Sequence, residues 1–346
     1  FTRNNYKVKL IFPLRSKTST DNLALLKKYY DFNDEIIFEG VKHNLPFGKF
    51  NFGEKYLFII SHYFWSKKVC KRFNLKENNN VQFFTRSDWI FYFLSKKGLN
   101  IIFECHQLSK IRKWVLRNSI DNPGAKIIFL NEKLLEDSGI NKKTFSKKIR
   151  IIPNGVDESL FSHVDNKKRN EIIFSGNLQR FNESRGLEFI INTFLNKNMP
   201  QEYRLKVIGG PSSEVKKLKE YVSKLGLTNK IEFLGRLDRN STIKNLEKGD
   251  IGLLINSSKN LHSINYSSPL KYFEYLFAEL KIVGVNFPSH KALPFAENIS
   301  FFNENNEESF INSIKNTSKS KALKRAELKS ITMESRVNEI ISLINK

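Results

Sequence analysis

Residues 268–276, with the sequence SPLKYFEYL, combine a phosphate-binding pattern with a carboxylate at helical spacing. Ser268 and Pro269 open an expected helix that carries Lys271 in its first turn and Glu274 in its second. The N–H groups at a helix start attract anions, and proline fits the first helical position. The pattern suits a nucleoside diphosphate, with its phosphates at the helix start and its ribose diol on Glu274. An ordinary capped core helix is the alternative interpretation.

Glycine turns follow three other apolar runs in the same half of the chain. Ser175-Gly176-Asn177 follows the expected strand Glu171–Phe174, and Arg185-Gly186 opens the next expected helix. Gly209-Gly210-Pro211 and Gly235-Arg236-Leu237 follow the next two expected strands. Glycine lets a phosphate approach the backbone closely, and arginine can bind it through two hydrogen bonds. Turns of this kind at successive strand ends indicate a phosphate-binding edge.

The elements that must position these residues come in two series of apolar runs, which are typical of buried parallel strands. The first series of expected strands is Val8–Phe12, Tyr56–Ile60, Val81–Phe84, Asn100–Glu104, Lys126–Leu130 and Ile149–Ile152, with helices at Asp21–Tyr30, Phe64–Phe73, Asp88–Lys97 and Gln107–Asn118. The second is Glu171–Phe174, Arg204–Ile208, Lys230–Leu234, Ile251–Ile255 and Lys281–Val285, with helices at Leu187–Leu195, Ser213–Leu225, Thr242–Glu247 and Pro269–Ala278. Two such series predict an α/β fold of two doubly wound domains that meet near Pro153–Asp157.

Composition limits the classes of protein that fit. The 346 residues are 40% hydrophobic, which is enough for buried cores in about two domains. Two cysteines, Cys70 and Cys105, argue against a disulfide framework and fit a reducing cytosolic setting. The sequence has no run of about 20 uncharged apolar residues that would span a membrane. The formal charge of +23 favours anionic partners, but compositional drift on solvated faces would explain it equally well.

The connection between the two series carries the sequence IIPNGVD at residues 151–157. It resembles the interdomain signature of GT-B glycosyltransferases, specifically the retaining family 4 type. Later motifs follow that family's order: Ser175-Gly176-Asn177 with Arg185-Gly186, then Val207–Gly210, Ile231–Gly235, Asp250–Leu254, Ser268–Tyr275 and Thr332–Val337. The resemblance implies a GT-B fold with two Rossmann-like domains and an interdomain cleft. Residues 1–156 would bind the acceptor and residues 157–330 the nucleotide sugar, with a helix in 331–346 packing back onto the first domain.

The resemblance also implies residue roles. Arg185 would neutralise the donor diphosphate, and Asn177 stands where many members have arginine, so that one positive contact is either missing or supplied from elsewhere. The turn at Arg236 and Leu237 would meet the nucleobase, and His106, after the expected strand Asn100–Glu104, would approach the donor sugar. The implied catalytic residues are His106, Arg185 and Glu274. The implied donor-binding residues are Gly176, Asn177, Arg185, Gly209, Arg236, Leu237, Ser268, Pro269, Leu270, Lys271 and Glu274.

Two features depart from the family pattern. Many members carry a second glutamate eight positions before the ribose glutamate, and here Tyr266 occupies that position. Donor-sugar recognition is therefore not specified by this pattern. The family also begins with a strand and a glycine-rich loop before the strand that resembles Val8–Phe12. We therefore expect the first domain to lack that strand and loop.

The implied activity is transfer of a sugar from a UDP- or GDP-linked donor to a saccharide or lipid-linked saccharide, as in cell-surface polysaccharide or glycoconjugate synthesis. The sequence shows no Asp-x-Asp metal clamp, so no metal and no cofactor is expected. Helix N–H groups with Arg185 and Lys271 would stabilise the departing diphosphate. Similar enzymes retain the anomeric configuration by same-face attack.

The acceptor side is suggested by Phe64–Phe73 and Ser109–Arg117, which mix Lys and Arg with aromatic residues. A basic amphipathic face suits peripheral contact with an anionic membrane, although solvated helices with buried aromatic residues are the alternative. We expect a cytoplasmic protein, in part at the inner face of the plasma membrane, with no nucleic-acid partner. Two alternatives remain: a GT-B sugar-nucleotide epimerase, and a basic nucleic-acid-binding protein.

Overall fold

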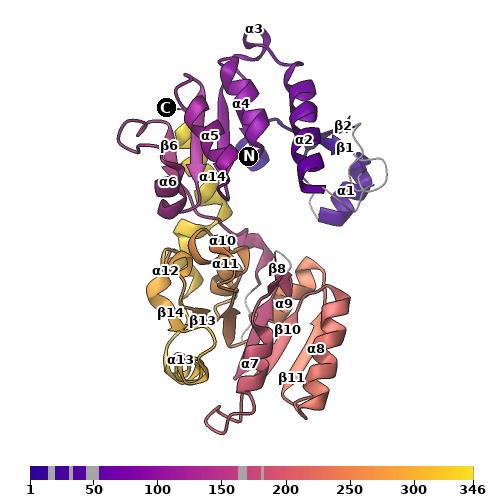
Figure 1. Cartoon of the computed structure of the whole chain (residues 1–346), viewed down its shortest axis with the longest axis vertical. Coiled ribbons are helices and arrows are strands. Elements are labelled where there is room, and N and C mark those ends of the chain that lie inside the picture. The colour runs from indigo at the N-terminus through magenta and orange to yellow at the C-terminus, as the bar shows by residue number, and fades with distance from the viewer. Residues whose placement is uncertain (15–19, 31–33, 44–53, 163–169, 181–182, 346) are drawn as a thin grey trace. The chain divides into compact units, whose positions relative to one another are not determined.

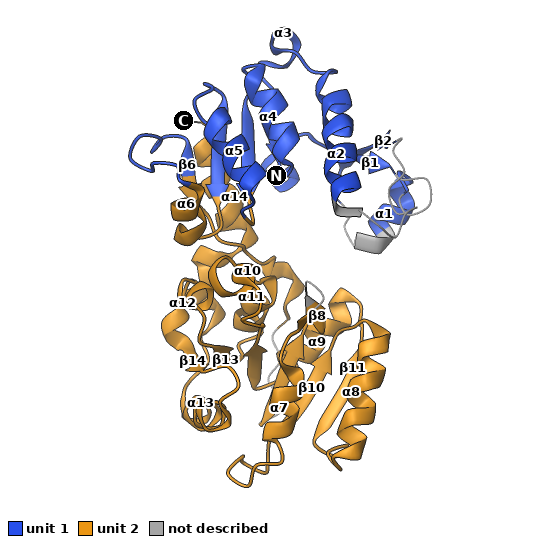
Figure 2. Ribbon diagram, viewed as in Figure 1, with its two compact units in different colours: residues 1–104, 108–128, 139–149 blue, residues 105–107, 129–138, 150–346 orange. Residues whose placement is uncertain are grey.

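The computed structural model describes residues 1–346 apart from 15–19, 31–33, 44–53, 163–169, 181–182 and 346. The chain divides into two compact units (Figure 2). Unit 1 comprises Phe1–Glu104, Leu108–Ile128 and Gly139–Ile149, and unit 2 comprises Cys105–Gln107, Phe129–Ser138 and Arg150–Lys346. The expected domain boundary between residues 156 and 157 stays a prediction.

The described residues of the N-terminal half form two sheets (Figure 1). A parallel pair joins β1 (Val8–Leu14) to β2 (Ile36–Lys42), and a four-stranded sheet has the order β3-β4-β5-β6. The strands of the second sheet are β3 (Phe83–Thr85), β4 (Ile101–Cys105), β5 (Ala125–Phe129) and β6 (Ile149–Ile151). The helices are η1 (Thr2–Asn4), α1 (Leu23–Tyr30), α2 (Glu54–Cys70), α3 (Leu75–Asn78), α4 (Asp88–Lys96), α5 (Lys110–Ser119), α6 (Glu132–Ser138) and η2 (Glu158–Leu160).

One sequence prediction in this half is wrong. Tyr56–Ile60 is predicted as a strand, but it lies inside α2, which runs without interruption to Cys70. No glycine, proline or asparagine separates the apolar run from the amphipathic stretch that follows, so a single long helix forms. The strand β2 over Ile36–Lys42 is not predicted by the sequence pattern.

The C-terminal half contains a six-stranded sheet of order β11-β10-β7-β12-β13-β14, in which all paired neighbours are parallel. Its strands are β7 (Glu171–Ser175), β10 (Arg204–Ile208), β11 (Ile231–Gly235), β12 (Ile251–Leu254), β13 (Lys281–Val285) and β14 (Ile299–Phe302). The short strands β8 (Gln179–Arg180) and β9 (Glu183–Ser184) form an antiparallel pair. The five predicted strands of the second series are present, and β14 is an addition.

Helices alternate with these strands in the chain. They are α7 (Leu187–Thr193), α8 (Ser212–Lys224), α9 (Arg239–Lys248), α10 (Leu261–Asn265), α11 (Leu270–Phe277), α12 (Pro288–Lys291), η3 (Ala296–Asn298), α13 (Glu307–Lys319), η4 (Arg325–Ile331) and α14 (Met333–Ile344). The predicted helices of the second series coincide with α7, α8, α9 and α11. Alternation of parallel strands and helices is the pattern of a doubly wound α/β fold.

Successive residues of each strand face opposite sides of the sheet, and this alternation builds two cores. On β7, Ile172 and Phe174 belong to one core together with residues of α7, α8 and α13. Ile173, between them, belongs to the other core together with residues of α9, α11 and η4. Helices therefore cover both faces of the six-stranded sheet. In the described residues, no helix combines the length and the apolar character that crossing a membrane requires.

Candidate functional site

The strand order of the six-stranded sheet defines where a ligand would bind. Numbered along the chain, the strands lie in the order 3-2-1-4-5-6, with β7 first and β12 fourth. From β7 the sheet first grows to one side, through β10 and β11, and then to the other side, through β12 and the later strands. The boundary between β7 and β12 is therefore a topological switch point. In open α/β sheets, ligands bind in the crevice outside the carboxyl ends of the strands at that point. The predicted site residues of unit 2 follow these strand ends.

The first two glycine turns are packed directly against each other. The Gly176 N–H donates to the Ile208 carbonyl at 2.9 Å, and the Gly209 N–H donates to the Gly235 carbonyl at 2.7 Å. A Cβ atom on Gly209 would lie 1.8 Å from the Gly176 carbonyl oxygen, and Gly209 has a φ of 153°. Only glycine fits at position 209. The hydrogen bonds between the turns connect the backbone at the ends of β7, β10 and β11.

Arg236 bridges two of these turns. Its Nη2 lies 3.3 Å from Oδ1 of Asn177, to which it donates a hydrogen bond. Its side chain crosses Gly210, where a Cβ atom would lie 2.9 Å from Cγ and Nε of Arg236. The structure therefore brings a guanidinium to the turn after β7, where the sequence offers the neutral Asn177. Leu237 packs against the core of unit 2.

The helix α11 begins at the predicted place. Pro269 is its N-cap residue and Leu270, 53% exposed, is its first residue. The first N–H groups of a helix have no intrahelical acceptor and point along the axis toward an anion. The Ser268 carbonyl accepts a hydrogen bond of 2.6 Å from Nδ2 of Asn154. The Ser268 hydroxyl is buried and has no hydrogen-bond partner within the described residues.

Lys271 reaches from α11 to the switch point. Its side chain is buried, with Nζ 4.2 Å from the centre of the Phe174 ring and 3.5 Å from the Ile255 carbonyl. Phe174 lies in β7 and Ile255 follows β12, so the ammonium group sits between the two strands that define the crevice. Burial and, to a smaller extent, the charge of Lys271 lower the pKa of His290 to about 4.

Glu274, one turn further along α11, carries an ion pair. Its Oε1 lies 3.3 Å from Nη2 of Arg239, the first residue of α9, and its side chain is 15% exposed. Burial raises the pKa of Glu274, and the Arg239 charge opposes that rise. The arrangement keeps a carboxylate acceptor beside a cation. Sequence reasoning missed Arg239, because no local pattern pairs it with Glu274 on another helix.

Tyr275 links α11 to the neighbouring strands β7 and β12 by hydrogen bonds. Its hydroxyl accepts a hydrogen bond of 2.8 Å from the Ser175 N–H and donates one of 3.4 Å to the Leu253 carbonyl. Burial raises the pKa of Tyr275, while the Ser175 hydrogen bond and the charge of Arg185 oppose the rise. Arg185, which is half-buried, therefore lies within electrostatic reach of the same strand ends. Sequence reasoning did not single out Tyr275.

Two further positions that the sequence singles out are His106 and Tyr266. His106 follows β4 and is half-buried, and its approach to a donor sugar stays a prediction. Tyr266, at the position of the family's first glutamate, donates a hydrogen bond of 2.5 Å to Oδ2 of Asp137 on α6. Burial first, and then this hydrogen bond, raise the pKa of Tyr266 to about 12. The described residues contain no group of three or more His, Cys, Asp or Glu placed to hold a metal ion.

No protein-family model matches the sequence, and no curated protein matches it significantly. Among solved structures, Anabaena HepE with UDP and glucose has a TM-score of 0.64 at 14% identity, over 98% of this chain and 99% of that chain. The lipopolysaccharide outer core galactosyltransferase WaaB, in its apo form, has a TM-score of 0.64 at 11% identity, over 98% and 99%.

A glycosyltransferase from Rickettsia africae has a TM-score of 0.66 at 15% identity, over 99% of this chain and 90% of that chain. These likenesses extend over nearly the whole chain, so they concern its full architecture. The chain has the GT-B fold, and the predicted fold class is confirmed. Because the sequence identities are low, these structural likenesses establish the fold alone, and the activity has to be argued from the site.

Proposed function

We propose that the chain is a glycosyltransferase whose unit 2 binds a UDP- or GDP-linked sugar. The observation that carries this proposal is the placement of the Lys271 ammonium between the ends of β7 and β12, with Glu274 one turn away on the same helix. One group suits a diphosphate and the other a ribose diol. A similar structure, that of HepE, holds UDP and glucose, which supports the choice of donor class.

The residues divide into roles by their chemistry. The N–H groups at the start of α11, with Ser268 and Lys271, would hold the diphosphate. Arg236 would supply the positive charge that Asn177 lacks, and Arg185 would add a second one. Preorganised cations and dipoles of this kind stabilise charge that develops on a leaving group. Together these residues would form a cluster of positive groups at the carboxyl ends of the strands.

The transfer step breaks the bond between the sugar's anomeric carbon and the diphosphate oxygen. A bond forms between that carbon and the acceptor oxygen on the same face, and the acceptor's proton passes to the departing diphosphate oxygen. The products are a glycoside with retained configuration and a nucleoside diphosphate. This step requires no side-chain nucleophile and no metal, and His106 would contact the donor sugar.

The acceptor we propose is a saccharide or a lipid-linked saccharide in cell-surface polysaccharide or glycoconjugate synthesis. A lipid-linked acceptor would bring a cytoplasmic protein to the inner face of the plasma membrane. The comparison with WaaB, a lipopolysaccharide galactosyltransferase, supports this acceptor class.

Calorimetric titration with a panel of UDP- and GDP-sugars tests the donor proposal. We expect one nucleotide sugar to bind selectively, and Glu274→Ala to weaken that binding about tenfold or more. Glu220→Ala, at an exposed position on α8, is the matched control and should bind as the unaltered chain does. A folded chain that binds no nucleotide sugar would overturn the proposal. NMR of the product's anomeric configuration tests retention, and conversion of the nucleotide sugar without an acceptor would favour an epimerase.

A further inference from the structure

Six aromatic side chains form a continuous group across three helices of unit 1, which we call the aromatic row. The ring centres of Tyr63 on α2 and Trp89 on α4 lie 5.0 Å apart. Those of Trp89 and Tyr92 lie 6.2 Å apart, and those of Tyr92 and Trp114 on α5 lie 5.2 Å apart. Phe64 and Phe93 join the group through Tyr63, with centres 5.4 Å from it in both cases.

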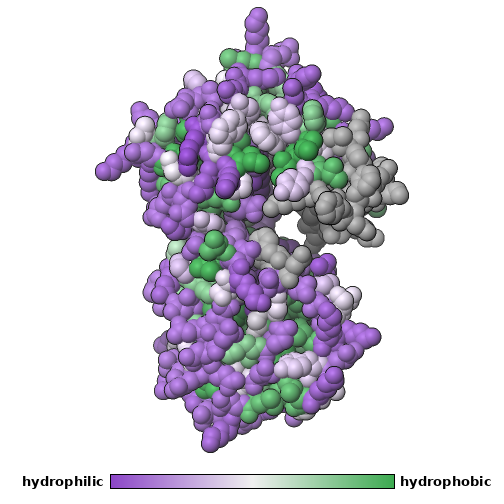
Figure 3. Space-filling model, viewed as in Figure 1, coloured by the Kyte–Doolittle hydropathy of each residue, from purple (hydrophilic) through white to green (hydrophobic). Residues whose placement is uncertain are grey.

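The aromatic row is accessible to solvent rather than enclosed in the core. Phe64 is 55% and Trp114 is 49% exposed, and the other four members are half-buried. Ile60, one turn before Phe64 on α2, is 52% exposed and extends the apolar area. Figure 3 shows apolar and near-neutral side chains on the face of unit 1 that carries these helices.

The polar tips of these rings are also available. In the described part of the chain, neither the indole N–H of Trp89 or Trp114 nor the hydroxyl of Tyr63 or Tyr92 makes a hydrogen bond. Trp65 behaves differently, because it is 7% exposed and donates a hydrogen bond of 3.0 Å to the Val41 carbonyl. An aromatic ring with an apolar body and an unbonded polar tip suits a boundary between water and hydrocarbon.

Positive charge surrounds the aromatic row. Residues 56–70 of α2 together with α4 and α5 contain seven Lys or Arg and one acidic residue, Asp88. Asp88 is neutralised by its ion pair with Arg112. Lys67, Lys96 and Lys110 are exposed and lie one helical turn from Tyr63, Tyr92 and Trp114, respectively, and Nζ of Lys96 lies 5.2 Å from the centre of the Tyr92 ring. The face therefore combines exposed aromatic rings with lysines at helical spacing.

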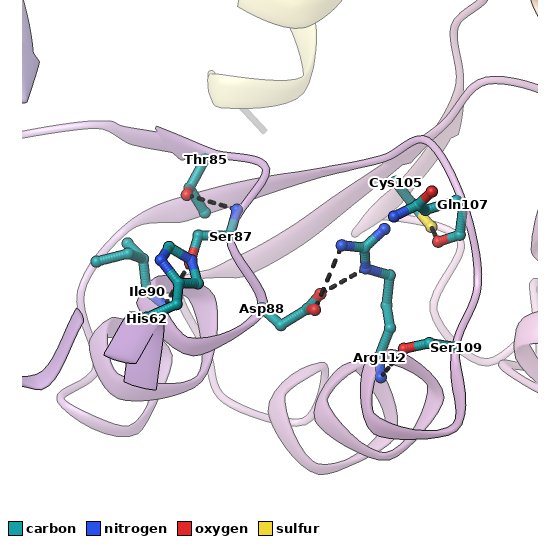
Figure 4. A network of polar contacts seen from close by, with 9 residues as sticks. All are labelled: His62, Thr85, Ser87, Asp88, Ile90, Cys105, Gln107, Ser109 and Arg112. Atoms are coloured by element: carbon teal, nitrogen blue, oxygen red, sulfur yellow. Dashed lines mark hydrogen bonds and ion pairs between the residues drawn. The ribbon is translucent and has the colours of Figure 1, made fainter. Parts of the chain in front are cut away.

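Polar contacts hold the three helices in this arrangement (Figure 4). Arg112 of α5 extends toward Asp88 at the start of α4, with Nε 2.5 Å from Oδ1 and Nη2 3.3 Å from Oδ2. His62 of α2 shares a hydrogen bond of 2.8 Å with the hydroxyl of Ser87, the N-cap residue of α4. A preformed face loses little conformational entropy when it binds a surface.

We propose that the aromatic row, with Lys67, Lys96 and Lys110, docks unit 1 on an anionic lipid bilayer. Aromatic rings would enter the headgroup boundary, and the lysines would contact anionic headgroups. The charge favours this occupant, because each lysine near an anionic membrane adds attraction, whereas a protein partner would need a matching acidic face. The proposal rests on the proposed function only for its purpose, which is access to a lipid-linked acceptor.

Co-sedimentation of the full chain with phosphatidylcholine vesicles, with and without phosphatidylglycerol, tests the docking. We expect binding to the anionic vesicles that weakens as salt rises, with a blue shift of tryptophan fluorescence from Trp89 and Trp114. The double variant Phe64→Ser/Trp114→Ser should bind at least about tenfold more weakly. The triple variant Lys67→Glu/Lys96→Glu/Lys110→Glu should lose binding to about the same extent or more.

Matched controls lie in unit 2. Lys216→Glu/Lys219→Glu/Lys224→Glu makes the same charge change on exposed positions of α8, and Leu195→Ser/Leu261→Ser removes exposed apolar side chains. Both should bind vesicles as the unaltered chain does, and circular dichroism would verify that every variant is folded. Equal losses in the α8 control, or no binding to anionic vesicles, would overturn the proposal. So would self-association through the aromatic row in place of lipid binding. Nucleotide-sugar titration of the same variants keeps a failure of docking distinct from a failure of the donor site.

Discussion

Arg239 and Glu274 form an ion pair of 3.3 Å between the start of α9 and the second turn of α11. Glu274 is the residue that the sequence assigns to the ribose, and its carboxylate is largely buried. Burial raises its pKa and Arg239 opposes that rise, so the arginine helps to keep the carboxylate ionised. An ionised carboxylate accepts hydrogen bonds from a diol more strongly than a neutral carboxyl group does.

Replacing Arg239 by alanine should change the pH dependence of donor binding. Without the opposing charge, the pKa of Glu274 rises further, so Glu274 takes up a proton at a higher pH. Affinity for the nucleotide sugar should then fall at a higher pH on acidification than it does in the unaltered chain. Titration calorimetry across a series of pH values measures this, and the donor is suitable because its diphosphate diester does not titrate near neutrality.

Arg239→Lys keeps the charge and should restore a pH profile close to that of the unaltered chain. Glu274→Gln removes the titrating group, so its weak binding should not depend on pH in this range. An Arg239→Ala profile identical in midpoint to the unaltered one would contradict the coupling of these two residues.

A second prediction concerns the contact of 3.3 Å between Arg236 and Asn177. Arg236→Ala should weaken nucleotide-sugar binding by about 1.5 to 3 kcal/mol, because a charge-assisted contact to the diphosphate is lost. Asn177→Ala should cost less, because it removes only the group that orients the guanidinium. A double-mutant cycle should show coupling of about 0.5 kcal/mol or more. Strict additivity would mean that the two residues act independently.

The second half of the chain was predictable because its parallel strands are buried on both faces and read as continuous apolar runs. The runs of β7, β10 and β11 each end in a glycine turn, so those strand ends and site turns were located together. The contact of Arg236 with Asn177 was not predictable, because it depends on the missing Cβ atom of Gly210, which lets the Arg236 side chain cross that residue. The hydrogen bond from Tyr266 to Asp137 joins residues 129 positions apart, and no local pattern indicates such a pair.

The first half was predicted less well, for a physical reason. Tyr56–Ile60 has the composition of a short strand, and only its continuation to Cys70 shows that it belongs to a helix. Its exposed positions, Tyr56 and Ile60, also lack the burial that an inner strand would have. The pattern of apolar residues therefore located the secondary-structure elements but did not distinguish a helix from a strand.

A third prediction tests the packing of the glycine turns by stability. Gly209→Ala should lower the free energy of unfolding by more than about 3 kcal/mol, because its Cβ would collide with backbone at Gly176. Gly226→Ala is the control, since Gly226 also has a positive φ of 69° but no atom within 4 Å of a built Cβ. It should cost about 1 to 2 kcal/mol. Urea unfolding of both variants makes the comparison, and equal losses would mean that backbone conformation alone matters.

The last prediction concerns Tyr266, whose hydroxyl donates to Asp137. Tyr266→Phe should lower the free energy of unfolding at neutral pH by about 1 kcal/mol, because one partly buried hydrogen bond is lost. Burial, and then the hydrogen bond to Asp137, raise the pKa of Tyr266 in the folded chain to about 12, above the ordinary tyrosine value of 10.0 that applies to the unfolded chain. The stabilisation is therefore complete below pH 10 and is lost as the pH rises through 12.

Denaturant unfolding of the unaltered chain and of Tyr266→Phe, compared at matched pH values, measures this dependence. The difference between the two free energies cancels the titration of the other tyrosines. It should stay constant below pH 10 and then shrink, because only the unaltered chain can ionise at this position. A difference that stays constant through pH 12 would show that the hydroxyl contributes no pH-dependent stability. Residue 266 would then hold its place by the packing of its ring, which phenylalanine retains.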